Sequence, residues 1–102
     1  MNAVEKDVKA LVSKELENAN RLNPLFHSQH EGFAVIVEEL QEAAEELREA
    51  YRHIDYAWNQ IRLNNSCVAR QQIVGVEYAA ERLATEAIQT AAMCKKFIQS
   101  EV

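Results

Sequence analysis

Apolar residues in the middle of the chain recur at alternating steps of four and three. That spacing places all of them on one face of an α-helix, whereas a strand would alternate at every second residue. Only two glycines and one proline interrupt the 102 residues, which disfavours folds with frequent turns, such as sandwiches and barrels. We therefore predict an all-α chain. The members of the stripe are Phe33, Val37, Leu40, Ala44, Leu47, Tyr51, Ile54, Trp58 and Ile61.

Three segments carry this helical periodicity, with two short breaks between them. We predict helices over about residues 3–20, 29–63 and 67–100, within a single domain that covers residues 1–102. The last two helices are expected to form a long helical hairpin. The N-terminal helix is too short to cover the hairpin's apolar stripe, so much of that stripe would face water. Two hairpins packed together would form a four-helix-bundle-like core with the first helices outside. The chain is therefore expected to form a homodimer or a homotetramer.

Local signals mark the ends of these helices. Pro24 disfavours the α conformation in the residue before it, so the first helix should end ahead of it. Ser28 and Glu31 are three residues apart and fit a capping box at the start of the second helix. Ser66 is expected to cap the third helix.

Acidic residues are concentrated in one part of the chain. The whole chain has a formal charge of −5, and residues 31–49 hold seven glutamates and one arginine, a sum of −6, so the remainder sums to +1. Without a basic block, nucleic-acid binding is not expected. The longest apolar run, residues 33–37, is far shorter than the roughly 20 residues that span a bilayer, and no secretory signal is visible. With only Cys67 and Cys94, no disulfide framework is expected, which indicates a cytoplasmic protein.

The segment Glu38–Glu39–Leu40–Gln41–Glu42 has the pattern E-E-x-x-E. Glu39 and Glu42 are three residues apart and therefore share a helix face, where their like charges repel. A hard cation such as Mg²⁺ prefers carboxylate oxygens and would offset that repulsion. These residues alone leave two interpretations open, a solvated acidic face and a metal site.

Two motifs resemble those of the MazG-like all-α nucleoside triphosphate pyrophosphohydrolases. They are HEGFAVIVEELQE, from His30 to Glu42, and EAIQTAAM, from Glu86 to Met93, which together cover 21 residues. The resemblance is to small members of this superfamily, many from phages and prophages, and the helix order extends it over most of the chain. It implies a dimeric or tetrameric helical bundle that hydrolyses a nucleoside triphosphate to monophosphate and pyrophosphate. The resemblance also implies Mg²⁺ as the cofactor, with Mn²⁺ as the alternative.

The family signature is E-E-x-x-E on one helix and E-x-x-D on the next, which implies a role for each matching residue here. Glu39, Glu42 and Glu86 would be metal ligands, and Glu38 or Glu39 would orient or deprotonate the attacking water. The fourth ligand position departs from the family, because Gln89 stands where the family has Asp. Its neutral amide still offers a carbonyl oxygen but brings no charge, so weaker metal binding and impaired catalysis are expected. The separation between the two motifs also exceeds the family's usual one, which a longer hairpin can absorb.

The chain has no glycine-rich phosphate loop, so metal ions and a few cations would have to hold the triphosphate. Arg82 lies one turn before Glu86 and is a candidate for phosphate binding, with an ion pair to Glu86 as its alternative role. Lys95 is a second candidate, and its alternative is to complement the dipole at the end of the last helix. A function of another class stays open, that of a non-catalytic interaction or structural protein of phage or prophage origin.

Overall fold

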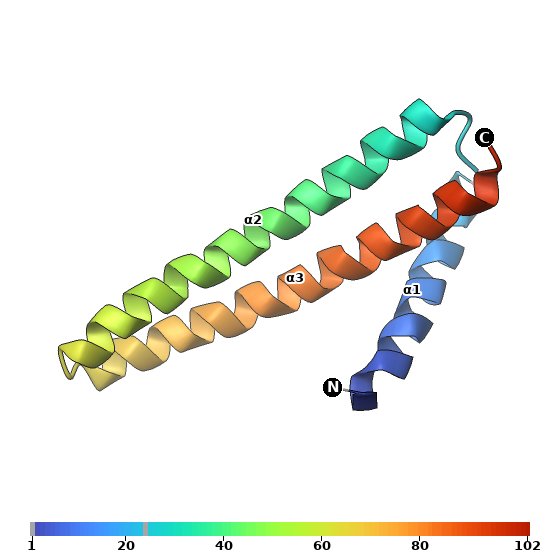
Figure 1. Ribbon diagram of the computed structural model, residues 1–102. Coiled ribbons are helices and arrows are strands. Elements are labelled where there is room, and N and C mark those ends of the chain that lie inside the picture. The colour runs from blue at the N-terminus through green and yellow to red at the C-terminus, as the bar shows by residue number, and fades with distance from the viewer. Residues whose placement is uncertain (1, 24) are drawn as a thin grey trace. The chain divides into compact units, whose positions relative to one another are not determined.

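The computed structural model describes residues 2–23 and 25–102, which form three α-helices (Figure 1). Helix α1 spans Asn2–Leu22, α2 spans Gln29–Arg62 and α3 spans Ser66–Ser100. No strand occurs in the described residues, so the all-α prediction is confirmed. Each helix end lies within two residues of its predicted position. Pro24, the expected terminator of the first helix, lies outside the described residues.

Two asparagines build the turn between α2 and α3. Asn64 has a positive φ of 57°, a conformation that asparagine tolerates better than most residues. The backbone N–H groups of Asn64 and Asn65 donate to carbonyls in the last turn of α2, at 3.0 and 2.9 Å, in a Schellman arrangement. Asn65 Oδ1 accepts a hydrogen bond from Val68 N at 3.4 Å and so caps α3. The prediction that Ser66 is the cap is therefore wrong by one residue.

The segment before α2 is held at both of its ends. Ser28 Oγ accepts a hydrogen bond from Glu31 N at 3.1 Å, which is one half of the predicted capping box. The Glu31 carboxylate is instead near His27, with 3.4 Å between Oε2 and Nδ1. Phe26 is buried, and its N–H donates to Ser100 Oγ at 2.9 Å, which ties this segment to the end of α3.

The chain divides into two compact units. The first combines the chain up to Gln41 with Glu86–Val102. Its core forms where α1 packs on the C-terminal half of α3: Val12 and Leu16 contact the fully buried Ala92. Further side chains of α3 pack against this cluster, namely Ile88, Ala91 and Met93.

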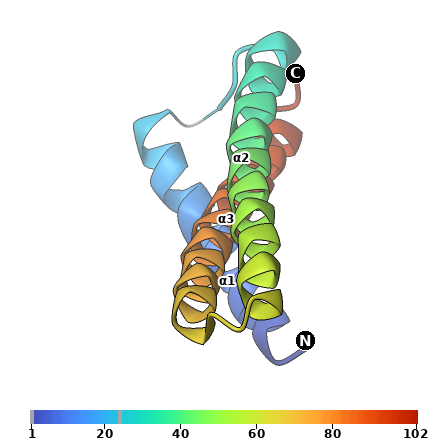
Figure 2. The same ribbon diagram turned by 90° about the vertical axis from the view of Figure 1, so that its left-hand side faces the viewer.

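The second unit, Glu42–Thr85, is a hairpin whose two arms lie side by side (Figure 2). Its buried apolar residues are all alanines, namely Ala43, Ala57, Ala69 and Ala79. Small side chains let two helices approach closely, but they remove little apolar area from water. Many large apolar side chains of this unit are exposed, and on α2 they include Leu47, Tyr51, Ile54, Trp58 and Ile61. Contact with α3 therefore leaves about half of each of these side chains uncovered.

Candidate metal centre

Three carboxylates from two helices lie close together. Glu39 and Glu42 are one turn apart on the unbroken helix α2, and Glu86 belongs to α3. One oxygen from each of the three lies within 4.8 Å of the others. Glu39 and Glu86 are half-buried, so water screens their charges less than it would on an open surface. The three glutamates predicted as metal ligands are thus the ones that the fold brings together.

Gln89 belongs to the same group of side chains. In the orientation that pairs its donor with acceptors, the amide nitrogen lies 3.2 Å from Glu39 Oε2 and 3.1 Å from Glu86 Oε2. A neutral donor between two carboxylates satisfies one lone pair of each and adds no charge. Residue 89 therefore faces the carboxylates, at the position where the family resemblance places an Asp. We define Glu39, Glu42, Glu86 and Gln89 as the carboxylate cluster.

The remaining candidate residues are not members of the carboxylate cluster. Glu38 is exposed; it is about 100° around the helix from Glu39 but one turn before Glu42. Arg82 pairs with Glu46 of α2, with 2.7 Å between Nε and Oε2, and not with Glu86. Lys95 is exposed and forms no ion pair within the described part of the chain.

One charged residue of the first unit is buried, although its place near the last turn of α3 predicts a surface residue that complements the helix dipole. Lys96 is only 5% exposed, and its ammonium lies 4.8 Å from the centre of the Phe26 ring. A cation over an aromatic face is attracted by the ring's negative quadrupole, which offsets part of the cost of burial. Adjacent Lys95 and Lys96 look alike in the sequence, so only the packing distinguishes them.

The second unit contains a histidine that joins its two helices. His53 Nδ1 lies 2.7 Å from Gln72 Oε1 of α3, and its ring packs on Gly75. A Cβ atom at position 75 would lie 2.6 Å from His53 Nδ1, so any other residue there would require the ring to move. One turn away on α2, the hydrogen bond and charge of Arg52 lower the pKa of Glu49. These contacts stabilise the hairpin and do not involve the carboxylate cluster.

Comparison with known proteins identified no relative of this chain. No family model, curated protein or solved structure matches this chain. Over the described residues, none of the three helices combines the length and apolar character needed to cross a membrane. The chemistry of the carboxylate cluster must therefore be argued from its own residues, which offer hard oxygen ligands of the kind that Mg²⁺ and Mn²⁺ prefer.

Proposed function

We propose that this protein is a MazG-like, Mg²⁺-dependent nucleoside triphosphate pyrophosphohydrolase that converts a triphosphate to monophosphate and pyrophosphate. Mn²⁺ would replace Mg²⁺, and the protein would act in the cytoplasm as a homodimer or homotetramer. One observation carries the proposal: Glu39, Glu42 and Glu86 converge within 4.8 Å of one another. These are the three positions that the resemblance assigned to metal ligands, and residue 89 lies beside them.

The roles of the side chains follow from this arrangement. Glu39, Glu42 and Glu86 would hold the cation, which supplies Lewis-acid stabilisation of charge on the phosphate oxygens. Glu38 is exposed and lies one turn before Glu42, so Glu38 or Glu39 would orient the attacking water or accept its proton. Arg82 would contact a phosphate after leaving Glu46, with which it pairs at 2.7 Å.

Gln89 sets the expected level of activity. As an amide it contributes no negative charge, so the site attracts a dication less strongly than one with four carboxylates. It also hydrogen-bonds two of the proposed ligands, at 3.1 and 3.2 Å, and these contacts must rearrange before Glu39 and Glu86 bind a metal. We therefore expect slow turnover and millimolar rather than micromolar affinity for Mg²⁺.

The same two hydrogen bonds favour the second candidate, a non-catalytic interaction protein. In that case the hydrogen bonds from Gln89 would offset the repulsion between Glu39 and Glu86 in the absence of a metal. The large apolar side chains exposed on α2 would then be the functional surface.

A pyrophosphate-release assay over common and modified nucleoside triphosphates, with Mg²⁺ and with Mn²⁺, tests the catalytic proposal. We expect release with at least one substrate, its loss in Glu86→Gln, and no change in the matched control Glu77→Gln, an exposed residue of the same helix. In parallel, millimolar Mg²⁺ should raise the melting temperature of the wild type but not of Glu86→Gln. If the wild type shows no turnover and no metal-dependent shift in melting temperature, the catalytic proposal is rejected and the non-catalytic function is favoured.

A further inference from the structure

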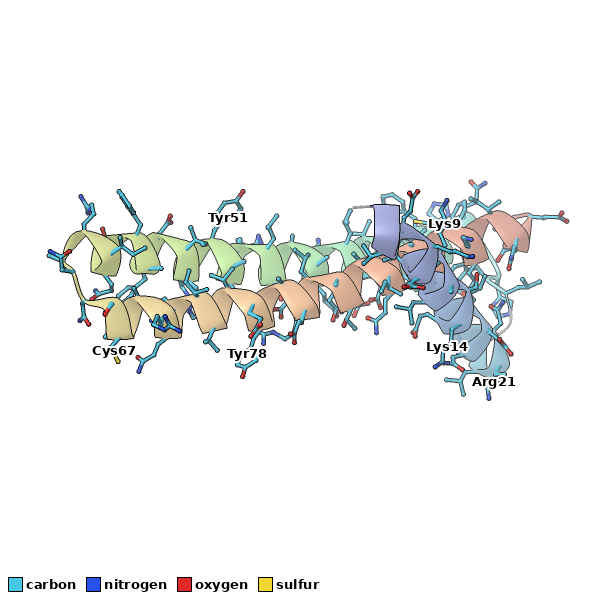
Figure 3. The ribbon with its side chains drawn as sticks, turned by 90° about the horizontal axis from the view of Figure 1, so that it is seen from below. Lys9, Lys14, Arg21, Tyr51, Cys67 and Tyr78 are labelled. Atoms are coloured by element: carbon cyan, nitrogen blue, oxygen red, sulfur yellow. The ribbon has the colours of Figure 1, made fainter. Side chains whose placement is uncertain are left out.

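Five large apolar side chains of the second unit form a continuous exposed stripe on α2, here called the α2 seam. Each is between 42% and 63% exposed. Leu47, Ile54 and Ile61 are seven residues apart, as are Tyr51 and Trp58. This average step of 3.5 residues is that of a helix that packs along its length against another helix. In Figure 3, Tyr51 projects away from α3, so α3 does not cover this member of the seam.

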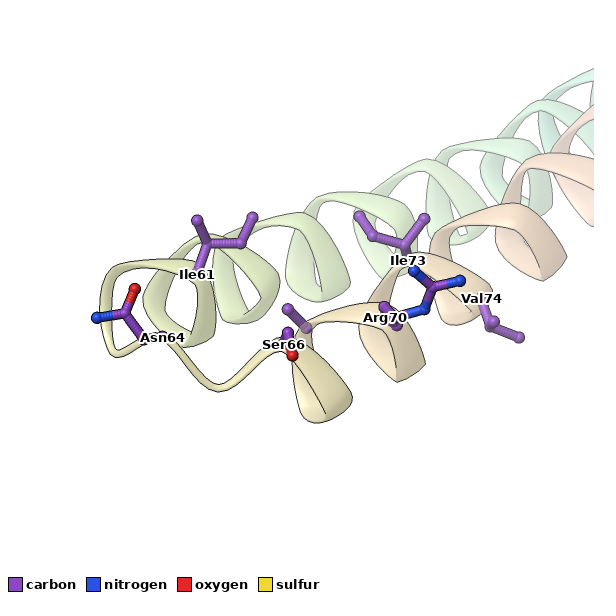
Figure 4. Close-up of a pocket in the computed structure, with 7 residues that line it drawn as sticks. Ile61, Asn64, Ser66, Arg70, Ile73 and Val74 are labelled. Carbon is purple, nitrogen blue, oxygen red and sulfur yellow. The ribbon is translucent and has the colours of Figure 1, made fainter.

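The apolar surface continues from the seam onto α3. Ile61 lines an open pocket of about 680 Å³ at the tip of the hairpin, together with Ile73 and Val74 of α3 (Figure 4). Both α3 residues are close to half exposed. The exposed apolar surface therefore includes residues of both helices of the hairpin. In a four-helix bundle, a hairpin likewise packs against its partner with residues of both helices.

The second unit has apolar side chains to supply to an interface. A stable interface removes at least about 800 Å² from each partner. The apolar residues that the second unit buries are alanines, and the large side chains of the α2 seam stay about half exposed.

Charged residues at the edge of the α2 seam indicate which partner binds there and whether its helix runs parallel or antiparallel to α2. Arg48 directly follows Leu47, and Asp55 directly follows Ile54, so the two charges lie on the same edge. Both are exposed, and neither forms an ion pair within the part of the chain that the structure describes. If two copies run antiparallel about a two-fold axis midway between these positions, each Arg48 meets the partner's Asp55. A parallel pair would instead place the −6 charge of residues 31–49 beside itself.

We propose that the α2 seam binds the α2 seam of a second copy of this chain in antiparallel orientation, with two reciprocal Arg48–Asp55 ion pairs. This surface goes beyond the catalytic proposal and does not depend on it. Sedimentation equilibrium of the full chain tests the association. The wild type should be at least a dimer, and Ile54→Lys should be a helical monomer. Tyr78→Lys, which changes an exposed side chain of α3 outside the seam, should stay a dimer. A folded wild-type monomer, or a dimer that Ile54→Lys leaves intact, overturns the proposal.

Two further measurements test the orientation. Asp55→Arg should raise the dissociation constant roughly tenfold by placing like charges together, and the swap Arg48→Asp with Asp55→Arg should restore it. In a chain with Cys67→Ser and Cys94→Ser, Tyr51→Cys should form a disulfide-linked dimer because position 51 lies near the axis. Ile61→Cys should not, because an antiparallel pair separates the two copies of position 61 by about 30 Å. Efficient linkage through Cys at position 61 would show a parallel pair and overturn the orientation, even if catalysis is established.

Discussion

Gln89 on α3 faces Glu39 on α2, with 3.2 Å between the amide nitrogen and Oε2. The same nitrogen lies 3.1 Å from Glu86 Oε2, so one neutral side chain donates to two carboxylates. A carboxylate at position 89 would turn these two attractions into repulsions unless a cation were bound. The identity of residue 89 therefore sets a balance between stability without metal and affinity for metal.

Gln89→Asp should lower the stability of the metal-free protein and raise its affinity for metal. In EDTA we expect the variant to lose about 1–2 kcal/mol of unfolding free energy, because two hydrogen bonds are lost and a charge is added to a half-buried group. With Mg²⁺ the added carboxylate should raise metal affinity by at least tenfold, seen as a larger metal-dependent rise in melting temperature. The matched control is Gln71→Asp, which changes an exposed glutamine of the same helix. Equal metal responses in the two variants would mean that residue 89 is not a ligand.

The ion pair between Arg82 and Glu46 competes with any role of Arg82 in phosphate binding. Glu46→Gln removes the carboxylate that holds the guanidinium at 2.7 Å and should lower KM for the triphosphate. Arg82→Ala should raise KM, with little change in kcat if Arg82 contributes only binding. Because Arg82 is more than half exposed, each change should cost no more than about 1 kcal/mol of stability. Steady-state kinetics and urea unfolding separate these effects, and unchanged KM values in both variants would assign Arg82 to structure alone.

The ring of His53 packs directly on the backbone of Gly75 and leaves no room for a side chain unless the ring moves. In Gly75→Ala the new Cβ would lie 2.6 Å from Nδ1, so the ring must move and its 2.7 Å contact with Gln72 is strained. We expect a net loss of about 1–3 kcal/mol, even though alanine favours a helix by about 1 kcal/mol over glycine. In a His53→Ala background the clash is absent, so the same substitution should be stabilising. A double-mutant cycle by chemical denaturation measures the difference, and additive effects would contradict the packing argument.

The pKa of Glu49 reports on its contact with Arg52. The hydrogen bond from Arg52, at 2.8 Å, is the main cause that lowers this pKa below its ordinary value of 4.5, and the charge of Arg52 adds to it. A lowered pKa in the folded state means that the contact contributes to stability above pH 4.5 and that this contribution is lost as the pH falls through the lowered value. The effect is small because the carboxylate is exposed.

Arg52→Gln should return the Glu49 pKa towards 4.5, which a carboxyl NMR titration can follow. Arg48→Gln is the control, since Arg48 lies on the other side of Glu49 in sequence and forms no ion pair with it within the described residues. A Glu49 pKa that does not move in Arg52→Gln would place the cause elsewhere.

The carboxylate cluster could be anticipated in part from the sequence. Glu39 and Glu42 are three residues apart, and helical geometry alone places them on one face. That Glu86 joins them required the resemblance, because no local rule relates residues of different helices. The pairing of Arg82 was not predictable, since Glu46 and Glu86 are both acidic and only the register of α2 against α3 brings Glu46 within 2.7 Å.

The amino-acid sequence by itself determined the three helices and nearly all of their ends, because helical periodicity and turn residues act over a few positions. It also placed a regular apolar stripe on α2, but it did not show which face of that helix would meet α3. The tertiary structure decided that. It buries Ala43 and Ala57, whereas Leu47 and Ile54, each one turn from one of these alanines, stay 44% and 42% exposed. Small side chains allow close approach of two helices within one chain, so the large side chains are left outside, where another helix would have to cover them.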